Sequence, residues 1–585
     1  MEKILMGGIV GFVLFTLLSY ILIILNVPWL IIPIFIFMLT KIKKPKIKFN
    51  IQTLLILIVF TLGIAGQMAV ITPSGVFQNG DLVFWSAHGH DASWHIALME
   101  EIKRGYPFGN PSFAGEKLVN YHFFSDIAPA IIGKYLPISN LNLYFRVFPF
   151  FYSLFLGASA YFLTKKITNN FEASIWATIF TYFSGSFGWV IGKGESVFWA
   201  TQPQSSSGNP PQIISNFLVL TFLYFVFSLT KKRSISTLLI CILILATMVE
   251  FKVYGAIVVL GATLLSGLWQ IAIPAGILAV ILYLPNSTAS SSFLIFEPWW
   301  YIRTMIVEPS RLNLVDWELK RQTYIYEHNW KRVVWLEGMG FIIFFFGNLG
   351  MRFIGLWEFL KTKLIIKFII IISLTLPLLF LQKGVASNTS QFLQYFVLLF
   401  GILAGIGTAK ITSKFKFLIP IIIIIMIPTQ VGLIKEFYGL PNAPRSAFAK
   451  ISSQELVALK FVKENTPEGT VLLTHPYNQY LNLGGTTPHI WDWFDTSYVS
   501  AFTERRTFMD DYEQADIMGY DYRPRYEIKK IIFESEDIDK VKTALSQTNA
   551  NILYFPKAVR PMINPEVLGL TKVFENQTVE VWKIN

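Results

Sequence analysis

Residues 81–126 read DLVFWSAHGHDASWHIALMEEIKRGYPFGNPSFAGEKLVNYHFFSD and gather most of the polar chemistry of the chain. Four of the seven histidines lie in this stretch, together with six acidic residues. The segments before and after it are apolar and long enough to cross a bilayer. We therefore expect a polar loop, residues 73–142 in all, that is presented at a membrane surface and held there by the rest of the chain.

The composition indicates an integral membrane protein. Of the 585 residues, 53% are hydrophobic and 15% are charged, and the mean hydropathy is +0.50, which is too apolar for an ordinary soluble protein. The net charge of +12 comes from short Lys and Arg clusters between apolar runs, where such clusters set topology, so no nucleic-acid partner is predicted. The single cysteine, Cys241, excludes an intrachain disulfide and a cysteine-based metal site.

The basic clusters predict the topology. Residues 1–25 are expected to be a retained first span, and a second span ends near residue 40. The cluster KIKKPKIK at 41–48 marks the cytoplasmic side, so a third span at 51–71 places the loop outside. Further spans are expected at 143–163, 173–191, 213–229, 235–248, 253–269, 271–284, 333–346, 364–381, 392–409 and 417–434. These give about thirteen transmembrane helices, with the later basic clusters on the side of the first.

The chain after residue 434 changes composition and predicts a second domain. Residues 1–434 form the expected transmembrane domain, and residues 435–585 an α/β domain outside the cytoplasmic membrane. A helix is predicted at 453–465 and another at 538–547. Strands are predicted at 470–474 and 551–555, with a closing hairpin formed by 571–575 and 579–583.

Asp91 has two interpretations. The apolar spacing of ASWHIALMEEIKRG predicts a helix that begins near Asp91 and ends at Gly105, which places Asp91 and His95 one turn apart on one face. In the first interpretation Asp91 is only the N-cap of this helix, which contributes about 1 kcal/mol. In the second it is a functional carboxylate, which also explains why histidines surround it.

The neighbouring side chains suit either a metal ion or an anionic ligand. His88, His90 and His95 beside a carboxylate are typical of zinc or a similar ion, but histidines at a membrane surface also bind phosphate. Lys117 and Tyr121, close to Glu116 and His122, suit an oxygen-rich anionic ligand. The residues alone leave both possibilities open.

The order of these features resembles the C-type glycosyltransferase superfamily, whose polytopic members use polyprenyl-phosphate-linked sugars. The resemblance is carried by an acidic first outside loop, by Asp91 followed by an amphipathic helix, by Gly109-Asn110-Pro111, by Glu116-Lys117 and then Tyr121, and by a C-terminal domain outside the membrane. Glu116-Lys117 is similar to the Glu-Lys pair of the mannosyltransferase-like branch, with Leu118 and Val119 where prolines usually follow.

The resemblance implies a fold, an activity and a set of site residues. Asp91 would be the catalytic base or orienting carboxylate, with Glu116 as a second catalytic residue. A divalent ion would be held by His88, His90 and Glu195, the last being the acidic residue of the second outside loop, 192–212. The expected substrate-binding residues are His90, His95, Lys117, Tyr121, His122 and Arg303.

The implied reaction moves a sugar from a polyprenyl-phosphate carrier to a lipid, glycan or protein acceptor outside the cytoplasmic membrane. It needs a carboxylate to activate the acceptor hydroxyl and cations to hold the leaving phosphate. Candidate cations are Lys117, Arg303, Arg311 and the intramembrane Lys252, which could instead form a salt bridge with Glu250. The aromatic residues 299–301 could stack on a sugar or lie at the membrane interface.

Two other functions fit the same sequence. A transporter or flippase for lipid-linked glycans also needs many spans and buried charges, but transporters tend to have paired half-repeats, and the sequence has no such symmetry. A metal-dependent hydrolase built on the histidines is the third possibility. The large outside domain and the concentration of polar residues in one loop favour an enzyme.

Overall fold

Apolar helices make up the larger part of the fold. The computed structural model describes residues 1–40, 50–231, 233–288, 294–383, 385–440, 443–481 and 483–584, so the cluster at 41–48 lies outside the described residues. Within these ranges, eight helical segments are long and apolar enough to cross a membrane: Glu2–Ile24, Ile51–Ala69, Asn140–Thr168, Pro210–Lys231, Trp269–Asn286, Trp330–Lys361, Ala386–Lys414 and Leu418–Tyr438. The protein is therefore a multi-pass membrane protein.

Other apolar helices are shorter than these eight segments. Shorter apolar helices cover Pro28–Phe37, Ile235–Phe251, Val253–Leu265 and Leu364–Leu379. The span expected at 173–191 is a helix only over Phe171–Phe183, and a 3-10 turn at Gly188–Ile191 follows it. The expected total of about thirteen thus stays a prediction.

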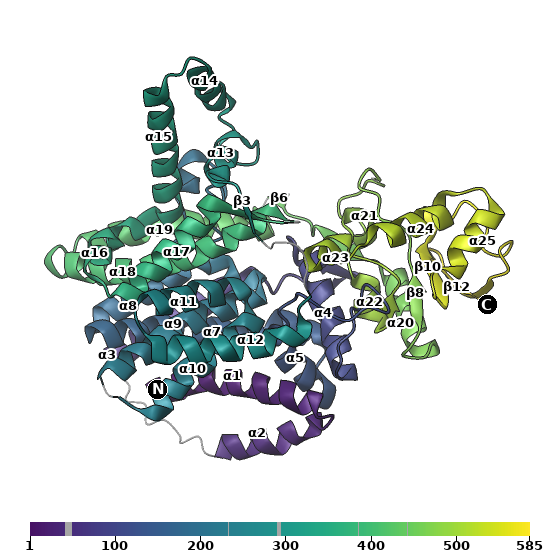
Figure 1. Cartoon of the computed structure of the whole chain (residues 1–585), viewed down its shortest axis with the longest axis horizontal. Coiled ribbons are helices and arrows are strands. Elements are labelled where there is room, and N and C mark those ends of the chain that lie inside the picture. Colours follow the sequence, from purple (N-terminus) through teal and green to yellow (C-terminus); the bar gives the residue numbers. More distant parts are fainter. Residues whose placement is uncertain are drawn as a thin grey trace.

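The bundle consists of apolar helices, most of which run roughly along the long axis of Figure 1. They are α1 (Glu2–Ile24), α2 (Ile31–Thr40), α3 (Ile51–Ala69), α7 (Phe148–Thr168), α8 (Phe171–Phe183), α9 (Pro210–Lys231), α10 (Ile235–Phe251), α11 (Val253–Leu265), α12 (Trp269–Tyr283), α15 (Trp330–Leu349), α16 (Leu356–Lys361), α17 (Leu364–Leu379), α18 (Leu393–Lys414) and α19 (Leu418–Tyr438). The apolar window of α18 is wholly buried. Gly405 lets α18 approach α8 closely, because a Cβ there would lie 2.3 Å from the backbone nitrogen of Ala177.

Residues 73–142 form a folded layer between the bundle and the C-terminal domain in Figure 1. It contains β1 (Val76–Gln78), β2 (Asp81–Phe84), α4 (His88–Arg104), α5 (Phe124–Tyr135) and α6 (Asn140–Asn142). Helix α4 ends at Gly105, as predicted, but begins at His88, and its N-cap is Ala87. The N-cap interpretation of Asp91 is therefore wrong, because Asp91 lies within the first turn of the helix.

The bundle carries a second set of short elements between its long helices. These are α13 (Trp300–Val307), α14 (Val315–Tyr326), and strands β3 (Leu294–Phe296) and β4 (Phe380–Gln382), which pair with each other. Helices α14 and α15 project from the bundle at the top of Figure 1.

The C-terminal domain contains the predicted helices and strands. Its elements are β7 (Ala449–Ile451), α20 (Ser453–Asn465), β8 (Val471–Leu473), α21 (Ile490–Trp493), α22 (Tyr498–Thr503), β9 (Arg506–Thr507), α23 (Tyr512–Met518), α24 (Arg523–Glu534), α25 (Ile538–Ser546), β10 (Ile552–Pro556), β11 (Thr571–Glu575) and β12 (Val579–Lys583). The sheet order is β11-β12-β10-β8-β9. Ser452 caps α20, since its side-chain oxygen accepts the N–H of Glu455 at 3.2 Å.

The first loop and the C-terminal domain are joined by main-chain and ionic contacts. Strand β7 pairs antiparallel with β2. The Nζ of Lys450 lies 2.8 Å from the carboxylate of Asp81. Glu101 of α4 is buried and binds both Arg104 and Arg506, so its charge is compensated from both sides. These contacts fix the C-terminal domain over the side chains of α4.

Candidate functional site

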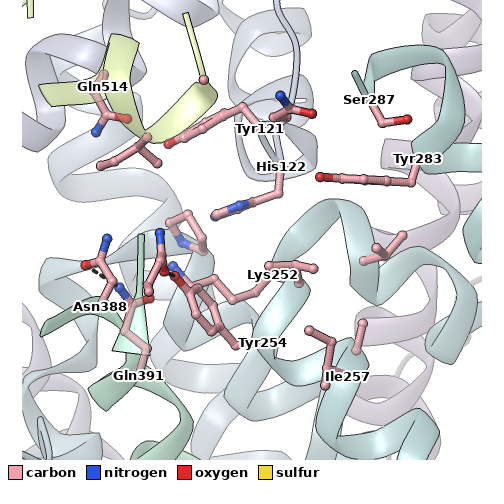
Figure 2. Close-up of a pocket in the computed structure, with 18 of the residues that line it drawn as sticks. Tyr121, His122, Lys252, Tyr254, Ile257, Tyr283, Ser287, Asn388, Gln391 and Gln514 are labelled. Carbon is pink, nitrogen blue, oxygen red and sulfur yellow. Dashed lines mark hydrogen bonds between the residues drawn. The ribbon is translucent and has the colours of Figure 1, made fainter. Parts of the chain in front are cut away.

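A cavity of about 1030 Å³ lies where the first loop, the bundle and the C-terminal domain meet. Its walls come from α4 and residues 120–122, from α10, α11 and α12, from residues 382–391, and from α23 with the loop that follows it. Figure 2 shows Tyr121, His122, Lys252 and Tyr283 around one space. Segments that are distant in the sequence thus form one site.

The cavity has one polar side and one apolar side. The apolar residues come from the three membrane helices and include Leu245, Val249, Ile257, Leu260, Ala279 and Val280. Ile257 is 37% exposed and Val280 is 55% exposed, so this wall continues onto surface that would face lipid. Such a cavity can hold a molecule with a polar head and a hydrocarbon tail.

Asp91 lies on the polar side. Its side chain is 38% exposed and lines the cavity together with His95, one turn further along α4. Burial raises the pKa of the Asp91 carboxyl, but the hydrogen bond from His90 and the charges of His90, His95 and His88 outweigh this and lower it. Asp91 is therefore an ionised carboxylate at neutral pH.

His90 connects Asp91 to the C-terminal domain. Its Nδ1 lies 3.2 Å from Asp91 and its Nε2 lies 3.0 Å from Asp511, whose side chain is fully buried. Burial lowers the pKa of His90, but the two carboxylates raise it further, to well above its ordinary value. The hydroxyl of Ser497 donates to the other oxygen of Asp511 at 2.9 Å. A charged imidazole with both N–H groups engaged thus holds Asp91 in one orientation.

A second histidine–carboxylate pair supports the same wall. The Nδ1 of His95 lies 2.9 Å from Oδ1 of Asp126, on α5. His122 stacks on Tyr121 with ring centroids 4.9 Å apart, and both line the cavity. Burial, followed by the charge of Lys252, lowers the pKa of His122 well below its ordinary value, so His122 is a neutral hydrogen-bonding group.

Lys252 brings a positive charge to the cavity from within the membrane helices. It is the single extended residue between α10 and α11, with φ −168° and ψ 106°, and it lies within electrostatic range of Asp91. Both carboxylate oxygens of Glu250 are buried without a hydrogen-bond partner among the described residues, so the salt-bridge alternative for this pair is wrong. Lys383 and Arg523 also line the cavity, and sequence reasoning had not identified them.

Several expected site residues lie elsewhere. Glu116 is exposed and lies 3.7 Å from Arg525, and Lys117 contributes its backbone carbonyl to the Tyr520 hydroxyl. Arg303 lies 4.0 Å from Glu297. None of the three lines the cavity of Asp91.

The outside aromatic residues have different environments. Trp299 stacks on Phe341 with centroids 6.0 Å apart. Tyr301 is fully buried, and its hydroxyl donates to the carbonyls of Ala386 and Ser387. Trp300 lines a smaller cavity that is next to the large one.

The residues do not fit the expected divalent ion. Nδ1 of His88 is bonded to Ser74 at 2.8 Å, and both ring nitrogens of His90 are engaged by carboxylates. Glu195 binds Gln204 and Ser205. Across the part of the chain that the structure describes, no three His, Cys, Asp or Glu side chains come together as a metal site requires.

Asp511 could not be found from the sequence as a functional residue. The local signal around Asp511 indicates only a helix N-cap, a role that it also has, since its side chain accepts the N–H of Gln514 at 3.3 Å. The contact with His90 spans 421 positions of the chain. Only the packing of the C-terminal domain on α4 creates it.

Comparison with solved structures finds several neighbours, among them two structures from Archaeoglobus fulgidus. One is the archaeal oligosaccharyltransferase AglB in complex with an inhibitory peptide and a dolichol-phosphate, at 11% identity and a TM-score of 0.47, covering 86% of this chain and 69% of that one. The other is the oligosaccharyltransferase in the apo form, at 11% identity and a TM-score of 0.48, covering 85% and 69%. No family model and no curated protein matches the chain. With identities of 11% and TM-scores below 0.5, the likeness by itself assigns no function to this chain.

Proposed function

We propose that this protein is a membrane glycosyltransferase that transfers a sugar from a polyprenyl-phosphate-linked donor to an acceptor outside the cytoplasmic membrane. Asp91 takes the proton of the acceptor hydroxyl. The hydroxyl oxygen then bonds to the anomeric carbon while the bond from that carbon to the phosphate oxygen breaks. A single displacement of this kind inverts the anomeric centre.

The donor's chemistry matches the two sides of the cavity. The polyprenyl tail would lie along the apolar wall of α10, α11 and α12, and the phosphate would lie near Lys252. As the bond to the sugar breaks, negative charge develops on the phosphate, and a cation in a site of low dielectric stabilises it. Lys383 and Arg523 also line this cavity and add positive charge to it.

The observation that carries the proposal is the presence of Asp91 and Lys252 on one cavity with an apolar wall. A general base, a cation for the leaving group and a groove for a lipid are the three requirements of the reaction. His90 and His95 position the polar wall, and His122 and Tyr121 offer neutral hydrogen-bonding groups to the sugar. Under this proposal residues 73–142 and the domain at 435–585 lie outside the cytoplasm.

Asp91→Asn tests the proposal. Asn has nearly the same size and cannot accept a proton, and Asp91 does not cap α4, so the variant should fold. We expect transfer to fall by about 10²- to 10⁴-fold, measured with an undecaprenyl-phosphate-linked sugar and protein in nanodiscs. Asp539→Asn, at an exposed position of α25, is the matched control. Transfer by Asp91→Asn at the rate of the control would refute the role of Asp91.

One observation favours a second function, the transport of a lipid-linked glycan. The break between α10 and α11 at Lys252 resembles the discontinuous helices that form transporter sites. A transporter would move a fluorescent polyprenyl-phosphate sugar across a liposome membrane without consuming it. If the lipid-linked sugar still crosses the membrane in Asp91→Asn and the donor is not consumed, transport is favoured over transfer.

A further inference from the structure

A second cavity lies beside the first and has a different chemistry. It measures about 530 Å³ and shares Asp516 and Tyr522 with the large cavity. Helix α23 forms the wall between them, because Gln514 and Ile517 line the large cavity while Tyr512 and Glu513 line the small one. The two cavities are thus neighbouring compartments of one site.

Two aromatic pairs line the small cavity, one from each part of the protein. Trp199 and Trp300 come from the outside loops of the bundle, with ring centroids 5.4 Å apart. Tyr512 and Tyr522 come from the C-terminal domain, with centroids 5.7 Å apart. Flat aromatic surfaces of this kind pack against the C–H faces of sugar rings.

The aromatic surface on the bundle side is held rigidly. The indole N–H of Trp199 donates to the carbonyl of Tyr301 at 3.0 Å, and the guanidinium of Arg311 lies 3.2 Å from the centre of the Trp199 ring. Trp199 also has a φ of +82°, which bulky residues rarely adopt and which is typical of functional sites. The position of Trp300 follows, because it packs on this fixed ring.

The charge of the small cavity is opposite to that expected for a phosphate site. Its charged lining residues are Glu308, Glu513 and Asp516. Glu513 and Asp516 make no side-chain hydrogen bond or ion pair with the described residues, so their oxygens are available to accept hydroxyl groups. Burial raises the pKa of Glu513; the charge of His90 opposes this, and the charges of Asp511 and Asp91 add to it. The cavity therefore lies within electrostatic range of the proposed base.

We propose that the small cavity is a carbohydrate-binding subsite that receives the hydroxyl-bearing end of the acceptor, and that the acceptor is therefore a glycan. This inference rests on the proposed function, because a bound glycan is an acceptor only if the protein is a transferase. The carboxylates repel the phosphate of the donor and accept hydrogen bonds from sugar hydroxyls. The large cavity, with Lys252, Lys383 and Arg523, holds the donor, and α23 keeps the two substrates apart until the hydroxyl reaches Asp91.

Saturation-transfer NMR tests the subsite on the full chain in nanodiscs, without a donor. The probes are the methyl glycosides of glucose, galactose, mannose and N-acetylglucosamine. We expect at least one to bind, and Trp300→Ala to weaken that binding about tenfold, since one aromatic stacking surface is lost. Trp300→Phe keeps a ring and should recover part of the affinity. Asp516→Asn, at an exposed carboxylate, should also weaken binding.

The matched controls are Trp330→Ala and Asp539→Asn. Trp330 is 57% exposed and lines neither cavity. Both should bind the glycoside as the wild type does. Failure of every glycoside to bind the wild type would overturn the subsite, and so would equal losses in Trp300→Ala and Trp330→Ala. Binding of a serine-containing peptide that Trp300→Ala abolishes would overturn the glycan assignment.

A parallel assay separates this inference from the proposed function. Consumption of the lipid-linked donor, by transfer or by slow hydrolysis, tests the function. Glycoside binding without any donor consumption would leave the subsite standing and refute the transferase. Donor consumption without glycoside binding would refute the subsite and leave the transferase standing.

Discussion

Asp511→Asn tests whether the C-terminal domain positions the proposed base through His90. In the wild type, the Nε2 of His90 lies 3.0 Å from Asp511 and its Nδ1 lies 3.2 Å from Asp91. Asn keeps the size of the side chain and can still cap α23. It removes the buried negative charge that favours the protonated imidazole.

The expected size of the effect follows from the two contacts. A hydrogen bond that involves a charged group contributes about 1.5–3 kcal/mol. The Asn oxygen still accepts one N–H of His90, so we expect about 1–2 kcal/mol of positioning to be lost. If this loss raises the free energy of the transition state by the same amount, kcat falls by about 5- to 30-fold. KM for the donor should change little, because Asp511 does not line the large cavity.

The pH dependence gives a signature that a purely structural role lacks. In the wild type the pKa of His90 is raised and that of Asp91 is lowered. Without the charge of Asp511, the pKa of His90 falls, and Asp91 loses its cationic neighbour, so its pKa rises. The acid limb of the rate profile should move to higher pH and the alkaline limb to lower pH. The active range thus narrows from both sides.

The assay is a pH series of kcat and KM with a lipid-linked donor, together with thermal unfolding of each variant. The contribution of the raised His90 pKa to stability is present at low pH and is lost as pH rises through that pKa, so unfolding is compared at one fixed pH. Asp539→Asn on α25 is the control. A variant that folds like the control and keeps the wild-type pH profile would show that His90 does not transmit an effect of Asp511 to Asp91.

Lys252→Met should raise the Kd for undecaprenyl phosphate about tenfold while Lys252→Arg recovers part of it, and unchanged binding in the Met variant would place the phosphate elsewhere. Glu455 is buried and its pKa is raised from 4.5 to about 7, so its contribution to stability falls as pH rises through this range. Glu455→Gln should therefore be more stable than the wild type above pH about 7, by about 1–3 kcal/mol, and should show no gain in stability at low pH. An equal gain in stability at low pH and above pH about 7 would contradict the pKa shift. Gln78→Cys and Ser546→Cys, each in a Cys241→Ala background, should react with an impermeant thiol reagent from the same side of intact cells, whereas labelling from opposite sides would refute the predicted topology.

The C-terminal elements could be predicted because local signals set them. The apolar spacing of 453–465 and the cap at Ser452 specify α20, and the alternating residues of 571–583 specify a hairpin. The start of α4 was predicted three residues too late. Ala87 gives no capping signal, and α4 packs against α5 and α22, which are tertiary contacts that the local sequence does not encode.

The sequence predicted how candidate residues lie relative to one another only within one helix, although Tyr121, His122 and Lys252 were also named and line the cavity. The 3.6-residue period places Asp91 and His95 on one face of α4 whatever the tertiary structure is, and both line the cavity. Glu116 and Arg303 were chosen for their residue type and sequence context, and such reasoning gives no direction in space. The structure places both outside the cavity.

The sequence by itself determined that the chain enters a membrane and that the polar residues gather between two spans, because hydropathy and helical periodicity are properties of neighbouring residues. Only the tertiary structure decided which groups face one another. The contact between Asp511 and His90, the entry of Lys252 from a broken membrane helix and the two cavities on either side of α23 all join segments that are distant along the chain. Such contacts depend on how preformed elements pack, and no local pattern encodes that packing.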